Sequence, residues 1–117
     1  MQYVDGFLIA VPKKKLAEYK KMAKLGSKVW REHGALDYRE CVADDVSWGK
    51  RTSFPRAVKR KANETVIFSF IIYKSRKHRD AVNKKAMKDK RFAGMDFKNM
   101  PFDTKRMIYG GFKTIVT

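Results

Sequence analysis

The stretch T-V-I-F-S-F-I-I-Y, at residues 65–73, decides the fold of this chain. Side chains along a strand point alternately to its two sides, and here both sides are largely apolar. A strand of this kind is covered on both faces, so we place it in the centre of a sheet. The stretch Y-V-D-G-F-L-I-A-V, at residues 3–11, has the same character and predicts a second strand of this kind.

Two helices are expected beside these strands. Pro12 suits the first turn of a helix, and apolar residues then recur at helical spacing through residues 16–33. Gly34 suits the left-handed position just beyond the end of this helix. Ser75 is expected to cap a second helix that extends to about Lys90.

The remaining segments complete the sheet. Residues 35–43 and 105–116 are predicted to be strands, and residues 92–103 a loop. We predict that residues 54–59 form a hairpin with residues 65–73 about the turn K-A-N-E.

These segments follow the order β-α-β-(β)-β-α-β. With right-handed crossovers, both helices lie on one face of an antiparallel sheet, which predicts a ferredoxin-like α+β fold as a single domain over residues 1–117. The strand alternation makes the other sheet face aliphatic, and a bare aliphatic face is an aggregation hazard. We therefore expect a second copy of the chain to cover it, sheet against sheet, in a homodimer.

The composition restricts the cellular setting. The chain carries one cysteine, Cys41, which excludes an intrachain disulfide and fits a reducing compartment. The N-terminus lacks the basic and apolar regions of a signal peptide, and no apolar run approaches the roughly 20 residues that span a bilayer. We therefore expect a cytoplasmic protein with no membrane partner.

The net charge is +16, from 28 Lys and Arg residues against 12 Asp and Glu residues. Such an excess favours polyanions. The predicted helices carry a candidate polyanion-binding surface made of Lys20, Lys24, Lys28, Arg31, Lys77, Lys84, Lys88 and Arg91. A solvated face surrounded by counterions is the simpler interpretation. Nucleic acid is the alternative partner and is not favoured, because the Gly-aromatic stretch Y-G-G-F lies on the last predicted strand rather than the third.

The stretch M-P-F-D-T-K-R-M-I-Y-G-G-F, at residues 100–112, holds a compact charged cluster where the final loop enters the sheet. Asp103, Lys105 and Arg106 form this cluster. It could bind a carboxylate or phosphate group, with Arg106 as the bidentate donor. An internal salt bridge or turn cap that pins the loop is the favoured alternative.

Glycines are concentrated in the first and last strands, which are neighbours in a ferredoxin-like sheet. Gly6 is therefore expected near Gly110 and Gly111. A bulge, a close helix approach or room for a ligand would each explain glycine there. Packing is the favoured explanation, with the flanking phenylalanines covering the bare backbone.

Several single residues are candidates for a ligand site. Glu40 and Cys41 lie within a predicted strand; Cys41 beside a base could be a nucleophile, but packing is the usual role of a lone strand cysteine. Trp30 could wall a pocket or fill the core. His33 also fits the last turn of a helix, where a cation is favoured. His33 and His78 lack the spaced cysteine or carboxylate companions of a metal site, so no metal is expected.

Four stretches resemble the YbaA-like family of small bacterial proteins of unknown function. They are Y-V-D-G-F-L-I-A-V-P at residues 3–12, A-L-D-Y-R-E-C-V-A-D-D-V at 35–46, F-S-F-I-I-Y-K-S-R-K-H-R-D-A-V-N at 68–83, and the stretch at 100–112. The family looks like a branch of the dimeric α/β-barrel group, in which two ferredoxin-like subunits close their sheets into a barrel. The resemblance therefore implies the same dimer as the covering argument.

This wider group includes cofactor-free oxygenases and haem-degrading enzymes, whose ligands lie in a cleft between helices and sheet. The haem-degrading branch has a histidine about ten residues after the aromatic residue that ends its third core strand. Here Asn83 stands at that distance from Tyr73, and His78 comes a turn early. No haem and no other cofactor is therefore expected.

The sequence thus supports two classes of function and leaves open whether the protein is an enzyme. The first is binding of an apolar or aromatic metabolite in the helix–sheet cleft, with chemistry like that of a cofactor-independent oxygenase or isomerase. This rests on analogy with the fold. The alternative is polyanion binding through the lysine-rich helical face.

Overall fold

The computed structural model describes residues 1–95 and 99–117. Its long elements are β1 (Tyr3–Pro12), α1 (Leu16–Glu32), β2 (Asp37–Val42), β3 (Glu64–Tyr73), α3 (Arg76–Met87) and β4 (Ile108–Lys113). Shorter helical turns are α2 (Phe54–Ala57) and three 3-10 turns at Lys13–Lys15, Lys90–Phe92 and Thr104–Arg106. The predicted loop over residues 92–103 includes residues 96–98, which lie outside the described residues. The order of the long elements confirms the predicted α+β class.

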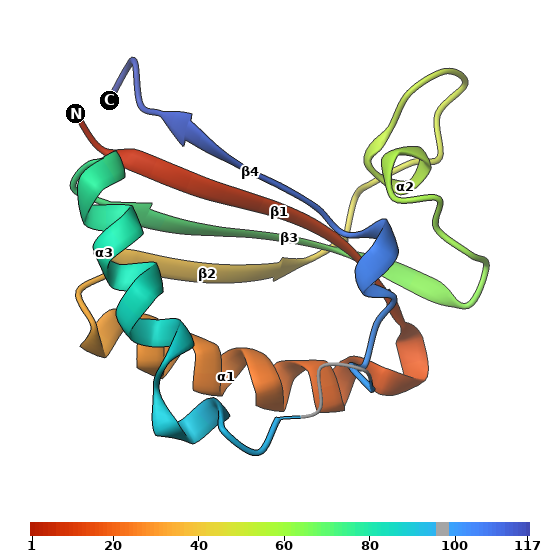
Figure 1. Ribbon diagram of the computed structural model, residues 1–117. Helices are drawn as coiled ribbons and strands as arrows, with labels where there is room; N and C mark the ends of the chain where they lie inside the picture. Colours follow the sequence, from red (N-terminus) through yellow and green to blue (C-terminus); the bar gives the residue numbers. More distant parts are fainter. Residues whose placement is uncertain (96–98) are drawn as a thin grey trace.

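β1 and β3 occupy the two central positions of a four-stranded antiparallel sheet with the order β2-β3-β1-β4 (Figure 1). They pair along their full length, from Tyr3 opposite Tyr73 to Pro12 opposite Glu64. Each therefore has a strand on both sides, which confirms their predicted central place.

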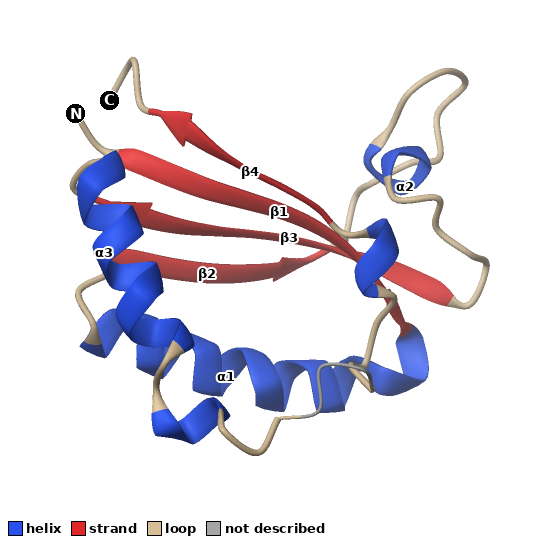
Figure 2. Ribbon diagram, in the orientation of Figure 1, coloured by secondary structure: helices blue, strands red, loops and turns tan. Residues whose placement is uncertain are grey.

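α1 and α3 lie against the same face of this sheet (Figure 2). Tyr19 and Ala23 of α1 pack against Ile9, Val11 and Ile67 of the central strands, and all five are buried. Burial of each aliphatic side chain contributes about 1.5–3 kcal/mol. The predicted helical stripe of α1 thus holds the helix to the sheet.

The predicted helix ends agree with the structure at three of four positions. Pro12 precedes the turn that leads into α1, and Gly34 follows α1 with a positive φ of 119°. The Ser75 hydroxyl accepts a hydrogen bond of 3.1 Å from the backbone N–H of His78 and caps α3. α3 ends at Met87 rather than near Lys90, and a separate 3-10 turn follows it.

The predicted hairpin strand at residues 54–59 is wrong. Residues Phe54–Ala57 form α2, which Ser53 caps by accepting a hydrogen bond of 3.1 Å from the backbone N–H of Arg56. Pro55 lies in the first turn, where its missing N–H costs nothing. The partner of β3 on this side is β2, which takes the edge position. β2 and β4 are also shorter than predicted.

The outer face, defined as the sheet surface away from α1 and α3, carries Val4, Leu8, Phe68, Phe70, Ile72, Ile108 and Phe112. It was predicted to be aliphatic, but three of these seven residues are phenylalanines. Phe112 is 64% exposed and Phe68 is 45% exposed. The prediction of an uncovered apolar surface is confirmed for the single chain.

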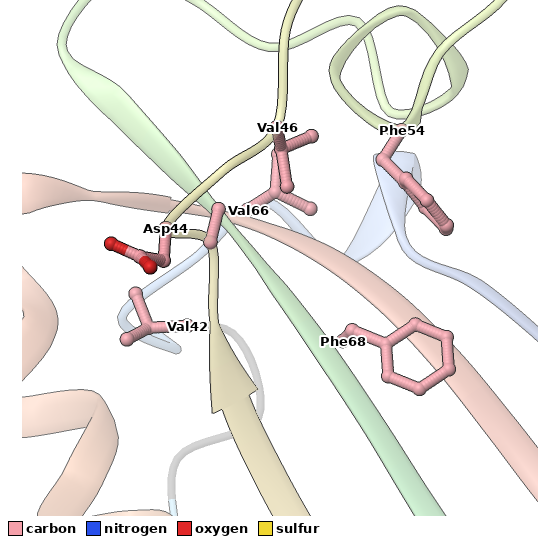
Figure 3. A pocket seen from close by; sticks show the side chains of 7 residues that line it. Val42, Asp44, Val46, Phe54, Val66 and Phe68 are labelled. Atoms are coloured by element: carbon pink, nitrogen blue, oxygen red, sulfur yellow. The ribbon is translucent and has the colours of Figure 1, made fainter.

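α2 and its flanking segments cover only one end of the outer face, where Val58 packs on Ala10 and Val66. A small apolar pocket of about 320 Å³ lies beside this contact. Figure 3 shows Phe54, at the start of α2, projecting toward the ring of Phe68. The two rings meet edge to face with their centroids 6.1 Å apart. The rest of the outer face has no such cover among the described residues.

The glycines of β1 and β4 make room for two aromatic rings. Gly6 lies opposite Gly110, as predicted, and a Cβ at Gly110 would lie 3.7 Å from the ring of Phe112 on the outer face. On the helical side, a Cβ at Gly111 would lie 2.6 Å from Cε2 of Tyr3. Packing thus explains these glycines, and Gly111 leaves the space that a buried tyrosine fills.

We predict that Gly111→Ala lowers the free energy of unfolding by about 1–3 kcal/mol, because the added methyl group overpacks the strand against Tyr3. Tyr3 is 8% exposed, and the guanidinium of Arg79 lies 4.9 Å from the centre of its ring, so the ring cannot move without losing contacts. Denaturant unfolding measures the change.

Gly94→Ala is the matched control, because a Cβ at Gly94 meets no described atom within 4 Å. Equal stability of the two variants would contradict the assignment of Gly111 to close packing.

Candidate functional site

A cavity of about 840 Å³ lies between the sheet and the helical layer. Its walls are sulfur-containing and aromatic side chains. Every methionine of the chain except Met1 lines it: Met22, Met87, Met95, Met100 and Met107. Trp30, Phe92 and Phe102 add aromatic surface. Methionine is flexible and polarisable, so these walls can adapt to ligands of different shape.

The inward-facing residues of the strands form a polar floor beneath these walls. Glu40 of β2 is the first of its two acidic groups. The hydroxyl of Tyr19 donates a hydrogen bond of 2.7 Å to Oε2 of Glu40, and the hydroxyl of Tyr38 donates one of 3.3 Å to Oε1. Burial raises the pKa of Glu40 above its ordinary value of 4.5. Burial also raises the pKa of both tyrosines, which therefore remain hydrogen-bond donors.

Gly26 of α1 allows Tyr38 to reach this position. A Cβ at Gly26 would lie 2.9 Å from the hydroxyl oxygen of Tyr38. Glycine inside a helix costs roughly 0.5–1 kcal/mol relative to alanine. The glycine lies at the point of the helix that faces the hydroxyl group of Tyr38, and its missing side chain leaves space for the hydrogen bond from Tyr38 to Glu40.

Asp5 of β1 is the second acidic group of the floor. It is 6% exposed, and its Oδ1 accepts a hydrogen bond of 2.7 Å from Nη1 of Arg79 on α3. Burial raises the pKa of Asp5, while the charge of Arg79 acts in the opposite direction. Arg79 also pairs with Asp80 at 2.8 Å. The floor therefore contains two carboxylates in different environments. Asp5 is paired with a cation, whereas Glu40 is hydrogen-bonded by two tyrosines.

Asn83 links the floor to the helical walls. Its Oδ1 accepts hydrogen bonds of 3.0 Å from the indole N–H of Trp30 and from the hydroxyl of Tyr73. Since its carbonyl oxygen is used in this way, the amide N–H₂ of Asn83 is its donor, and a hydrogen bond from this side chain to the carboxylate of Asp5 acts to lower the pKa of Asp5. Trp30, placed by the sequence either in a pocket wall or in the core, thus serves as a wall with its polar edge satisfied.

Comparison with known proteins places the chain in a family. Residues 2–104 match a family described as a protein of unknown function, DUF1428. The chain belongs to this family. It is 50% identical to the protein named Uncharacterized protein YbaA of Escherichia coli strain K12, over 116 residues that cover 99% of this chain and 98% of that protein. The YbaA of Shigella flexneri shows the same identity and coverage. The predicted resemblance to the YbaA-like family is confirmed.

A solved structure also resembles the fold of this family member. The de novo designed protein Foldit4 superposes with a TM-score of 0.50, covering 97% of this chain and 99% of the designed chain. Its sequence identity is 11%, so the likeness concerns the fold alone.

The structure brings two of the seven predicted ligand-site residues, Trp30 and Glu40, into the cavity of this DUF1428 protein. Cys41 is exposed on the opposite sheet face from Glu40. His33 lies at the end of α1, where its Nε2 is 2.8 Å from Oδ2 of Asp89. Neither Cys41 nor His33 lines the cavity.

The charged cluster of the final loop forms an internal ion-pair network. Both Nη atoms of Arg106 donate to the carboxylate of Glu64, which is 3% exposed, at 2.8 and 2.6 Å, and its Nε donates to Asp103 at 3.0 Å. These hydrogen bonds hold the pKa of Glu64 below its ordinary value. Asp103 also accepts from the backbone N–H of Lys105. This geometry matches the favoured alternative, in which the cluster pins the loop.

All eight residues of the candidate polyanion-binding surface are exposed. Two of them have acidic partners among the residues that the structure describes. Arg31 lies 3.1 Å from Asp37, and Arg91 lies 2.7 Å from Glu32 and 2.8 Å from Asp89. Over residues 1–95 and 99–117, no helix is long and apolar enough to cross a membrane, and no cluster of three potential metal ligands occurs.

Sequence reasoning missed most of the polar floor. Asp5 could have been found, because it lies at an inward position of β1, in step with Phe7 and Ile9, where an acid is unusual. The contribution of Arg79 could not, because 74 residues separate it from Asp5. Tyr38 was not recognised either, because its role depends on the space left by Gly26.

We predict that Glu40→Gln changes how stability depends on pH. Because folding raises the pKa of Glu40, the folded state holds this proton more tightly than the unfolded state does. The stability from this group is therefore present below pH 4.5 and is lost as pH rises through the folded pKa. Relative to the Gln variant, the wild-type protein should lose about 1.4 kcal/mol per unit of pKa shift.

Denaturant unfolding between pH 4 and 8 measures this difference, with Glu18→Gln on the exposed side of α1 as the control. The same pH-dependent difference in both variants would show that the environment of Glu40 is not special.

Proposed function

We propose that this protein binds an apolar or aromatic small molecule in the helix–sheet cavity, and that it does so as a homodimer. The cavity itself is the observation that carries the first part. Small-molecule sites are typically clefts of about 300–1,000 Å³, lined by apolar and aromatic side chains with a few placed polar groups. The cavity has this size and this composition.

The polar floor supports a ligand with one polar end. Arg79 and Asn83 of α3 and Glu40 of β2 all line the cavity together with the methionines and Phe102. A ligand that is apolar throughout would displace water from these groups without forming a hydrogen bond to them, at a cost in affinity. An aromatic ring with an attached carbonyl or carboxylate group would contact the apolar side chains with its ring and hydrogen-bond to the polar ones.

The proposed homodimer pairs two outer faces, as in a dimeric α/β barrel. The charge distribution supports a second copy as the occupant. The chain carries a net charge of +16, yet across the outer-face positions of the four described strands the charged residues are few. They are Asp37 and Arg39, which pair at 3.2 Å, and Glu64, which is 3% exposed and pairs with Arg106 at 2.6 Å. Two copies can therefore meet at this apolar surface without bringing their positive charges into contact.

We predict that Ala23→Phe blocks the cavity. Ala23 is 8% exposed and lines the cavity from α1, so a phenyl ring there occupies ligand space. N-phenyl-1-naphthylamine, which fluoresces strongly in apolar surroundings, is the probe. Wild-type protein should bind it, and Ala23→Phe should weaken binding at least about tenfold, the equivalent of 1.4 kcal/mol.

Ala17→Phe places the same ring at an exposed position of α1 and should leave binding unchanged. No fluorescence increase with wild-type protein, or equal binding by all three proteins, would contradict the proposed site.

We predict that sedimentation equilibrium gives twice the chain mass for wild-type protein and the monomer mass for Phe68→Asp. The substitution places a carboxylate in the centre of the outer face, where dimer formation would have to bury it at a cost of several kcal/mol. Ala81→Asp adds the same charge on the exposed side of α3 and should stay dimeric. A wild-type protein that remains monomeric at high concentration would contradict the dimer.

A further inference from the structure

Glu40 stands apart from the other acidic residues. Among residues 1–95 and 99–117, every other buried or half-buried Asp or Glu has a basic partner: Asp5 has Arg79, Asp37 has Arg31 and Arg39, Glu64 has Arg106, and Asp89 has Arg91 and His33. Glu40 is half-buried and has no cation within ion-pair distance in this part of the chain. In a protein with 28 Lys and Arg residues, this is a distinctive arrangement.

The neighbours of Glu40 hold it in place without neutralising it. Tyr19 reaches it from α1 and Tyr38 from β2, and Ser69 lies opposite it on β3. All three are neutral hydroxyl groups. An ionised carboxylate has about four positions that accept hydrogen bonds, so two tyrosines orient it and leave acceptor capacity toward the cavity.

This is the environment that proton-transfer groups use. A half-buried carboxyl group without a cation binds its proton more tightly than one in water, which suits a group that accepts and returns a proton. A carboxylate that served only to hold α1 to the sheet would need neither an open side nor a cavity. Glu40 has both.

We propose that Glu40 is a catalytic residue that accepts a proton from a ligand in the cavity, and that the ligands are aromatic carbonyl compounds with an acidic C–H bond next to the carbonyl group. The inference rests on the proposed function, since it requires that the cavity bind a small molecule. It narrows the ligand to a carbon acid and the reaction to isomerisation.

The proposed step is balanced without an oxidant or a cofactor. An Oε atom of Glu40 forms a bond to the proton as the C–H bond breaks. The electron pair of that bond becomes the C=C bond of an enolate, and the carbonyl π electrons move onto oxygen. Glu40 then returns the proton to the enolate oxygen, giving the enol, or to carbon. Arg79, which lines the same floor, is the cation that a carboxylate group of the ligand would face.

Phenylpyruvate is a suitable probe, because it has an aromatic ring, a ketone, a carboxylate and acidic benzylic C–H bonds. In D₂O, loss of its benzylic proton signal reports proton exchange by NMR, and broadening of its ring signals reports binding. Wild-type protein should accelerate the exchange over buffer. Glu40→Gln should still bind phenylpyruvate and should lose the acceleration by about 10²–10⁴-fold, the usual contribution of a general base.

Two further variants make the test specific. Glu40→Asp keeps the carboxylate and should recover part of the rate, which a purely structural role would not predict. Glu18→Gln removes an exposed carboxylate from α1 and should exchange at the wild-type rate. Near-UV circular dichroism of each variant establishes that the aromatic core is intact.

The outcomes separate this inference from the proposed function. If phenylpyruvate binds without faster exchange, or if Glu40→Gln exchanges as fast as wild type, the inference is overturned and the binding function stands. If N-phenyl-1-naphthylamine binds and phenylpyruvate does not, the inference is likewise overturned while the proposed binding function stands. If neither compound binds, the proposed function falls and the inference falls with it.

Discussion

The pairing of β1 with β3 is the constraint on which the rest of the molecule depends. These two strands supply the inward side chains that hold α1 and the outward side chains of the outer face, so their register decides what each layer contains. A slip by one residue would turn Asp5 outward and Val4 inward and would exchange the two faces completely. Such a slip is costly, because Ser69, opposite Glu40 in the polar floor, would then move to the apolar outer face.

Much of the fold could be predicted from the sequence, because its main signals are local. Two-sided apolar strands, a helical stripe with Gly34 behind it and a serine cap at Ser75 each depend on neighbours within a few residues. The segment at residues 54–59 was misassigned because its pattern also suits a strand. Ser53 and Pro55 decide in favour of a helical turn, and β2 already fills the place beside β3.

The site was less accessible to prediction, because it is made by distant residues. Glu40 and Trp30, which line the cavity, were predicted only as single residues of suitable chemistry, and Asp103 and Arg106 form the internal salt bridge of the favoured alternative. What makes Glu40 unusual is that no cation lies within ion-pair distance of it among the residues that the structure describes, and a sequence with so many basic residues gives no sign of that. The pairing of Asp5 with Arg79, and the room that Gly26 leaves for Tyr38, exist only once α1 and α3 rest on the sheet.

The concentration of methionines around one cavity has a chemical consequence. Oxidants convert a thioether to a sulfoxide, which is polar and chiral. If methionines were spread through the protein, such damage would fall on many unrelated places. Here one cavity is lined by five methionines: Met22, Met87, Met95, Met100 and Met107. Oxidation of several of them would therefore place several sulfoxide groups on the lining of the same cavity. Treatment with peroxide would therefore make the lining of the cavity polar, while the hydrogen-bonded strands of the sheet kept their structure.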